Sequence, residues 1–152
     1  MTVPQEYTQA SRDFDRFMIA ARQALGHSTT HQTYYSVLAV FLVFSRRVGL
    51  GDALLFANAL PPVLRAIFVS DWDPVEPIRE FADRDLMTRE AQDFRRDHSF
   101  TPDDAIEVVA RVVRDHVDGR DFDRVLAAMP AAARAYWSAP QDAGVEVTRR
   151  GS

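Results

Sequence analysis

The chain has 152 residues, of which 47% are hydrophobic and 26% are charged, and its formal net charge is −4. A chain of this length and apolar content can bury a core as one domain, which excludes wholesale disorder. It contains no cysteine, which excludes disulfides, thiolate metal sites and a cysteine nucleophile. Its acidic balance argues against nucleic-acid binding, because that activity needs a basic surface that neutralises phosphates.

The first helix is predicted from an apolar stripe with helical spacing. Its members are Phe14, Phe17, Met18, Ala21 and Leu25. Gly26 follows this stripe and can end the helix in a left-handed conformation.

A second helix is predicted from about Thr30 to Arg47, opened by a capping box in which Thr29 accepts from the amide of Gln32. The helix is apolar on nearly every face from Tyr34 to Phe44, so we expect it to be buried on several sides. That run would rise only about 16 Å as a helix, against a hydrocarbon core of about 30 Å, so it cannot span a membrane. With no secretory signal in the first residues either, we expect a cytoplasmic protein.

Glycines and prolines mark the next boundaries. Gly49 and Gly51 break the chain, Asp52 favours the start of a short helix that runs to Leu60, and Pro61 ends it. A fourth helix follows on an apolar stripe of Val63, Leu64, Ile67 and Phe68.

The second half is also helical. We predict a connector over 71–77, a charged helix or a broken pair of helices over 78–98, and a helix that Thr101 starts as its N-cap and that ends near Gly119. Short helices are predicted over 121–129 and 130–137. No segment shows the two-residue alternation of a strand, so the predicted fold class is all-α.

The two halves align without a gap at an offset of 69 residues, from Thr33–Asp73 onto 102–142. The shared signature is Asp52, Pro61 and Arg65 in the first half and Asp121, Pro130 and Arg134 in the second. We predict a helical bundle of two tandem repeats of about four helices each, over about 10–74 and 78–140. The repeats should pack as one domain over 1–140, with a flexible tail at 141–152.

The run FANALPPVLRAIF from Phe56 to Phe68, followed by Trp72-Asp73-Pro74, resembles the signature of the bacterial domain of unknown function 2267 family. The resemblance covers about Phe14 to Trp137 and has a weaker echo in the second half. It implies an all-helical, internally duplicated bacterial protein. It implies no established activity and no catalytic residues.

The polar residues form no motif for catalysis, a cofactor or a metal. His27 and His31 are four residues apart, but the predicted helix boundary separates them, and no second set of ligands follows. The acids around Gly119 lack the order of a calcium loop. We therefore expect no catalytic residue, no cofactor and no metal site.

The duplicated pairs Asp52/Arg65 and Asp121/Arg134 have two interpretations. The first is a salt bridge or a cap that joins two short helices across the proline. The second is a binding role.

The halves differ in polarity at equivalent positions. The first half has a candidate interaction face of Leu38, Phe41, Leu42, Leu54, Leu55, Val63 and Leu64. The equivalent residues in the second half are Glu107, Ala110, Arg111, Asp123, Arg124, Ala132 and Ala133. Because a large exposed apolar patch is unfavourable, something should cover the face. The cover could be the segment before Phe14 or the Ile78–His98 region, a second subunit, or an elongated apolar ligand.

The sequence thus predicts a non-enzymatic interaction or structural protein that self-associates, or contacts another protein, through this face. The alternative is a small apolar ligand-binding protein with a cavity between its helices. That cavity would be lined by Phe41, Phe44, Phe56 and Phe68. An enzyme is the third hypothesis.

Overall fold

The computed structural model describes residues 2–95 and 100–138, and within these residues every regular element is an α-helix. The helices are α1 (Gln5–Thr8), α2 (Ala10–Leu25), α3 (Thr30–Ser45), α4 (Leu50–Asn58), α5 (Pro62–Ser70), α6 (Arg84–Asp93), α7 (Ala105–Asp115), α8 (Gly119–Ala127) and α9 (Ala131–Tyr136). The predicted all-α fold is therefore confirmed. The tail predicted at 141–152 lies outside the described residues.

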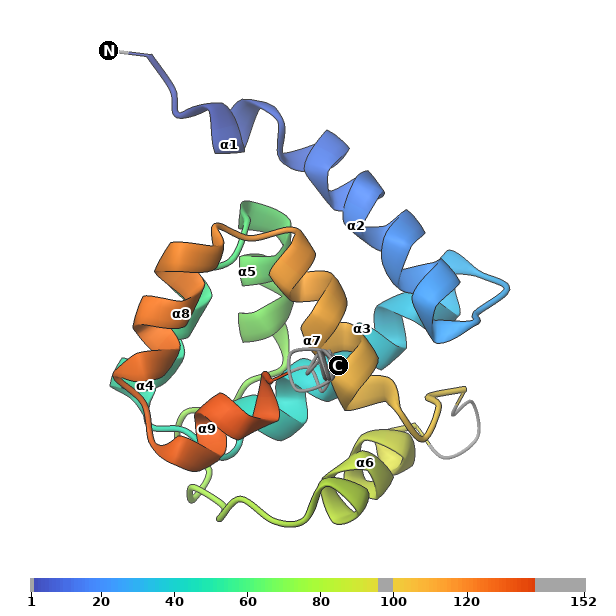
Figure 1. The fold of residues 1–152 in the computed structure, drawn as a ribbon, viewed down its shortest axis with the longest axis vertical. Helices are drawn as coiled ribbons and strands as arrows, with labels where there is room; N and C mark the ends of the chain where they lie inside the picture. The colour runs from blue at the N-terminus through green and yellow to red at the C-terminus, as the bar shows by residue number, and fades with distance from the viewer. Residues whose placement is uncertain (1, 96–99, 139–152) are drawn as a thin grey trace, which may run out of the picture.

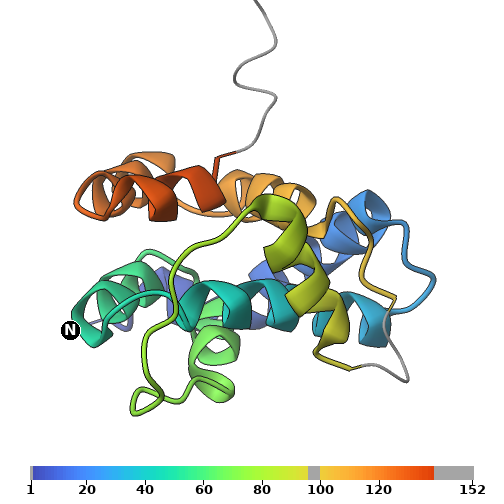
Figure 2. The same ribbon diagram turned by 90° about the horizontal axis from the view of Figure 1, so that it is seen from below.

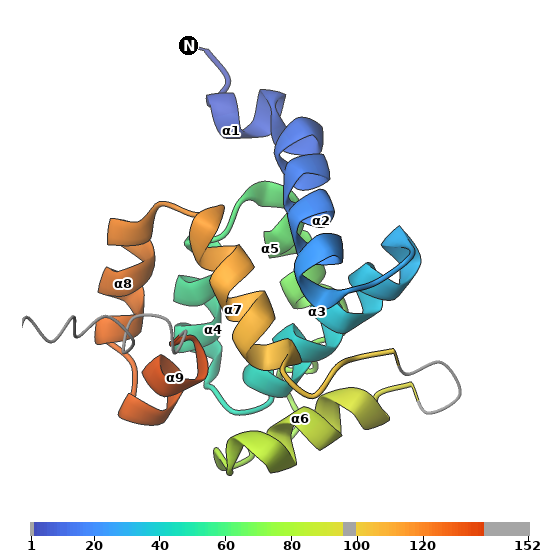
Figure 3. The same ribbon diagram turned by 45° about the vertical axis from the view of Figure 1, so that its right-hand side comes forward.

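The helices form two layers. One layer holds α7, α8 and α9, and the other holds α3, α4 and α5, with α6 packed against α3 at the edge (Figure 2). The long helix α2 packs against both α3 and α7 and so joins the layers on the opposite side from α9 (Figures 1 and 3). In the part of the chain that is described, no helix is both long and apolar enough to cross a membrane.

The connection from α2 to α3 follows the predicted punctuation. Gly26 ends α2 with a φ of 70°, a left-handed conformation that suits glycine. Thr29 caps α3, its side-chain oxygen accepting from the Gln32 amide at 3.1 Å. The Gln32 side chain reaches back one residue further than in a capping box, because its Oε1 accepts from the amide of Ser28.

Helix α3 is the centre of the molecule. Every residue from Ser36 to Ser45 is buried, as the apolar run predicts. The end of α9 and the residue that follows it close over α3: Tyr136 donates a hydrogen bond from its hydroxyl to the Val40 carbonyl at 2.6 Å, and Trp137 packs edge-on against Phe44. The core therefore joins residues from both halves of the sequence.

Three predicted boundaries are wrong, and tertiary hydrogen bonds explain two of them. The region predicted as helical over 78–98 is described as far as residue 95, and there its helix is α6; residues 78–83 before it are not helical, because the Arg79 amide donates to the Arg46 carbonyl. Thr101 does not cap α7, because its hydroxyl hydrogen-bonds to Ser36 and its carbonyl accepts from Gln92. Helix α8 begins two residues early, with Asp118 as its N-cap.

Helix bounds in the two halves agree with the sequence offset. Helix α8 begins and ends 69 residues after α4: Gly119 is the first residue of α8 and corresponds to Leu50, and Ala127 is the last and corresponds to Asn58. The first residues of α5 and α9, Pro62 and Ala131, have the same offset. The arrangement of the complete chain as two repeats stays a prediction.

Candidate functional site

Most of the candidate interaction face is core. Leu38, Phe41, Leu42 and Leu64 are all buried, and Val63 is partly buried. The Phe41 ring, for example, packs against Phe68 with ring centroids 5.6 Å apart. Of the three predicted covers, the structure gives the same chain for these residues, because they fill the space between α3 and its neighbours.

The cover over α3 comes from the charged region that was one of the predicted alternatives. Helix α6 packs along α3, and Glu90 of α6 holds Arg47 at the end of α3 with a 2.6 Å contact between Oε2 and Nη2. Arg47 is buried, and it also donates to the carbonyls of Val43 and Glu80. The connector and α6 are thereby fixed to the central helix.

Glu90 is the centre of this ionic network. Its Oε1 also accepts from Arg46 at 3.3 Å and from Arg79 at 3.0 Å. Burial alone would raise the pKa of Glu90, but the hydrogen bond and charge of Arg47, together with Arg79 and Arg46, outweigh burial and lower it. Sequence reasoning missed this network, and the signal was the Arg46-Arg47 pair directly after an apolar helix.

Three leucines on α4 remain exposed. Leu54 and Leu55 of the candidate face are each 50% exposed, and Leu50, which sequence analysis did not select, is 55% exposed. Leu50 could have been found from its four-residue spacing to Leu54, which places both on one side of a helix. We call Leu50, Leu54 and Leu55 the α4 face.

The surroundings of the α4 face are mixed in character. The other exposed residues of α4 are Gly51 and Asn58, and Asp52 is partly exposed. Leu50 also lines a recess with the apolar residues Trp72 and Ile78 and the charged residues Arg46, Asp73 and Glu76. Apolar side chains therefore extend from α4 to Trp72 and Ile78, with charged side chains beside them.

The neighbouring helix α8 has the same length but the opposite surface. It packs beside α4 at one end of the molecule (Figure 1). At the positions equivalent to Leu54 and Leu55 it carries Asp123 and Arg124, both exposed. The solvent-exposed side is therefore apolar on α4 and charged on α8.

The arginines of the repeat signature are caps. Arg65 reaches back across Pro61 and donates to the carbonyls of Ala57 and Leu60 at the end of α4. Arg134 makes the equivalent contact, donating to the Met129 carbonyl at the end of α8. The structural role predicted for these arginines was either a salt bridge or a helix cap, and the contacts are those of a cap.

The predicted salt bridges to aspartate are wrong. The acid nearest Arg65 is Glu6 at 3.9 Å rather than Asp52, and Asp121 pairs with Arg124 at 2.7 Å rather than with Arg134. Each arginine is occupied by helix-end carbonyls, which are unpaired acceptors that attract a cation.

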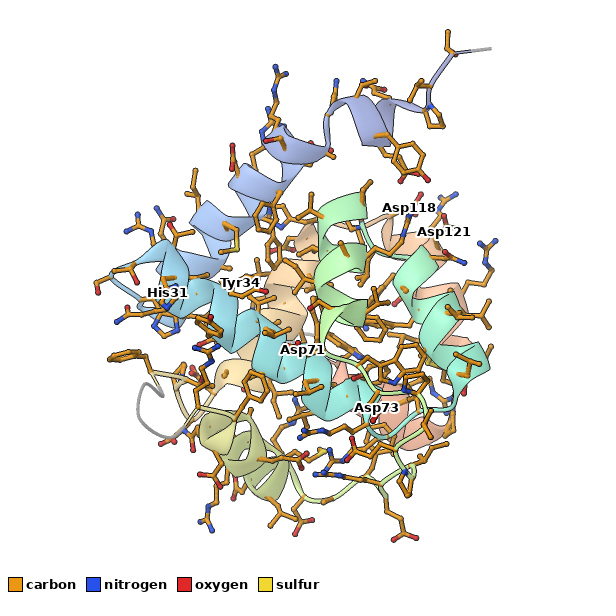
Figure 4. The ribbon with its side chains drawn as sticks, turned by 180° about the vertical axis from the view of Figure 1, so that it is seen from behind. His31, Tyr34, Asp71, Asp73, Asp118 and Asp121 are labelled. Carbon is orange, nitrogen blue, oxygen red and sulfur yellow. The ribbon has the colours of Figure 1, made fainter. Side chains whose placement is uncertain are left out.

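The histidines and acids singled out in the sequence do not come together. His27 meets Ser36, with 2.8 Å between Nε2 and Oγ, whereas the ring of His31 packs against Tyr35. Asp118 caps α8 far from Asp73 of the connector, as Figure 4 shows. Within 2–95 and 100–138, no three His, Asp or Glu side chains gather as metal ligands.

The expected phenylalanine-lined cavity is also absent from the described core. Phe44 and Phe56 lie 4.7 Å apart between ring centroids, and Phe56 and Phe68 lie 5.0 Å apart. Trp137 fills the space next to Phe56 at 4.9 Å. Side chains of both halves of the chain thus occupy the volume expected for a ligand.

Comparison with known proteins identifies the chain at the family level. No curated protein matches it. The family model for an uncharacterised conserved protein, DUF2267, matches residues 14–136, which run from within α2 to the end of α9, and this confirms the resemblance found in the sequence. The chain belongs to the DUF2267 family.

Proposed function

We propose that this protein is a non-enzymatic interaction protein of the cytoplasm that associates with a second copy of itself through the α4 face. The observation that carries the proposal is the exposure of three leucines on a helix of nine residues. Apolar surface removed from water on association contributes about 25 cal/mol per Å². Such a patch on a soluble protein is typical of an interaction site.

The core does not need these leucines. The inner side of α4 is supplied by Ala53, Phe56 and Ala57, all buried. Helix α8 packs its own inner residues while carrying Asp123 and Arg124 on its outer side. A charged outer surface is therefore compatible with a helix in this position, which leaves the leucines of α4 without a role inside the chain.

The character of the surface favours a second copy as the occupant. The three leucines carry no charge, and a two-fold axis beside Leu54 would bring the same apolar side chains of two copies together. The patch is smaller than the roughly 800 Å² per partner of a stable complex, so we expect a weak dimer. Ile78 and Trp72 at its edge would extend the contact.

The test exchanges the outer residues of α4 for those of α8. Sedimentation velocity is measured from micromolar to millimolar concentration for the wild type and for the double variant Leu54→Asp, Leu55→Arg. We expect the wild type to dimerise at the high end and the variant to stay monomeric with its melting temperature nearly unchanged, because both positions are half exposed. Leu86→Asp on α6 is the matched control, since Leu86 is equally exposed but lies on another helix.

Two results contradict the proposal. One is a wild type that is monomeric throughout this concentration range. The other is a dimer that persists in the double variant. A dimer that Leu86→Asp abolishes would move the interface to α6.

A further inference from the structure

A groove of about 300 Å³ opens at the other end of the domain from α9, separate from the α4 face. It lies where the first half of α2, the start of α5 and the end of α7 come together (Figures 1 and 3). Its apolar lining includes Phe14, Phe17, Val63 and Leu64. Small-molecule sites have this character, with volumes from about 300 Å³ and a few polar groups among apolar ones.

Two carboxylates face this groove from different helices. Asp13 comes from α2 and Asp115 from the last turn of α7. Neither side chain makes a hydrogen bond or an ion pair within the described part of the chain. Arg16 is the one arginine in the lining; it and Asp115 are exposed and Asp13 is partly buried, and two carboxylates against one guanidinium give the lining a negative charge balance.

The helix ends add to this preference for a positive charge. Asp115 is at the C-terminal end of α7, where the free carbonyls already produce a negative potential, so a bound cation is favoured there. The start of α5 next to it has fewer amide donors than most helix starts, because Pro61 and Pro62 carry no amide hydrogen and the first free amides are those of Val63 and Leu64.

The wall of the groove is aromatic and fixed. The Phe17 and His116 rings pack edge to face with 5.6 Å between centroids. His116 Nδ1 hydrogen-bonds to the Val112 carbonyl at 2.8 Å, which holds the imidazole in place. Aromatic surfaces accept both flat apolar groups and organic cations.

We propose that this groove binds a small organic cation with a flat apolar body. The body packs against Phe14, Phe17 and Val63. The positive group is held by the carboxylates of Asp13 and Asp115. This site is independent of self-association through the α4 face.

The experiment uses benzamidine as the probe, with neutral benzamide and anionic benzoate as compounds of nearly the same shape. Binding to the full chain is followed by two-dimensional NMR. We expect benzamidine to shift the amide signals of Phe14, Phe17, Val63 and His116, and to bind more tightly than either analogue. Asp13→Asn and Asp115→Asn should each weaken benzamidine about fivefold while leaving benzamide unchanged.

Two further variants complete the design. Asp85→Asn removes an exposed acid from α6, away from the groove, and should leave binding unchanged. Val63→Trp should block the groove, and the two asparagine variants decide the question if that protein does not fold. Equal binding of benzamidine and benzamide, tighter binding of benzoate, no effect of either asparagine variant, or shifts confined to α4 would each overturn the proposal.

Discussion

The buried hydroxyl of Tyr136 makes stability depend on pH in the alkaline range. This side chain is almost completely buried, and its hydroxyl donates to the Val40 carbonyl of α3. Burial raises the pKa of Tyr136 well above its ordinary value of 10.0; the charges of Arg84 and Arg47 oppose this only in part, and that of Glu90 adds to it. The native state therefore keeps the proton at pH values where the unfolded chain has lost it.

The direction and the size of this change in the free energy of unfolding follow from the difference between the native and unfolded pKa of Tyr136. Because the native pKa is the higher one, the stabilisation is complete below about pH 10 and is lost progressively as the pH rises from there towards the native pKa. The free energy of unfolding should fall by about 1.4 kcal/mol per pH unit, or by about 2 kcal/mol at about pH 11.5. The chain has no lysine and no cysteine, so the tyrosines are the side chains that ordinarily titrate in this range.

The substitution Tyr136→Phe tests this reasoning, because it removes the hydroxyl and with it both the hydrogen bond to Val40 and the group that titrates. At neutral pH the variant should lose about 1 kcal/mol, the net value of one hydrogen bond. Urea unfolding of both proteins, followed by far-ultraviolet circular dichroism from about pH 8 to 11.5, should give curves that cross somewhat above about pH 10.5. The exposed Tyr7 provides the control, because Tyr7→Phe should retain the wild-type slope. Parallel curves for the wild type and Tyr136→Phe would refute this reasoning.

Four other substitutions test the remaining contacts. Glu90→Gln should destabilise the protein at neutral pH by about 3 kcal/mol, because it leaves the buried Arg47 without its charge partner. Since the native pKa of Glu90 is lowered, wild-type stability should also fall as the pH drops below about 4.5, and the variant should show a flatter acid limb in urea unfolding. Arg65→Ala and Arg134→Ala should each lower the melting temperature through loss of a helix cap worth about 1 kcal/mol, and calorimetry that finds no change in either would return these arginines to a binding role. Leu38→Glu should abolish cooperative melting, because it buries a carboxylate without a partner, whereas a folded monomer would make Leu38 part of an interface after all.

Local signals in the sequence were sufficient for most of the fold. The stripe that ends at Gly26, the Thr29 cap and the break at Pro61 each depend on residues within one or two turns, and the structure has all three. The errors occur where a distant partner takes over a polar group. Thr101 is the clearest case, because its local context predicts an N-cap but its hydroxyl bonds to Ser36 on another helix.

The candidate site was harder to predict because hydrophobicity does not say which side of a helix will be covered. Leu38 and Leu54 looked equivalent in sequence, as apolar residues opposite charged ones in the second half. In the structure Leu38 is 3% exposed and Leu54 is 50% exposed. The difference depends on which helices pack against α3, α6 among them, and no local pattern fixes their positions.

The contrast between halves therefore has two different causes. Helix α3 lies between α2, α5, α6 and α7, and so it must be apolar all round, whereas α7 lies at the surface of the other layer and keeps Glu107 and Arg111 on its outer side (Figure 2). Packing accounts for that difference completely. It does not account for α4 and α8, which lie side by side with comparable inner contacts and yet carry leucines on one and charges on the other. Of these two helix pairs, in the part of the chain that is described, α4 and α8 are the pair whose difference the fold leaves unexplained, which is why we place the proposed self-association on the α4 face and not on the buried residues of α3.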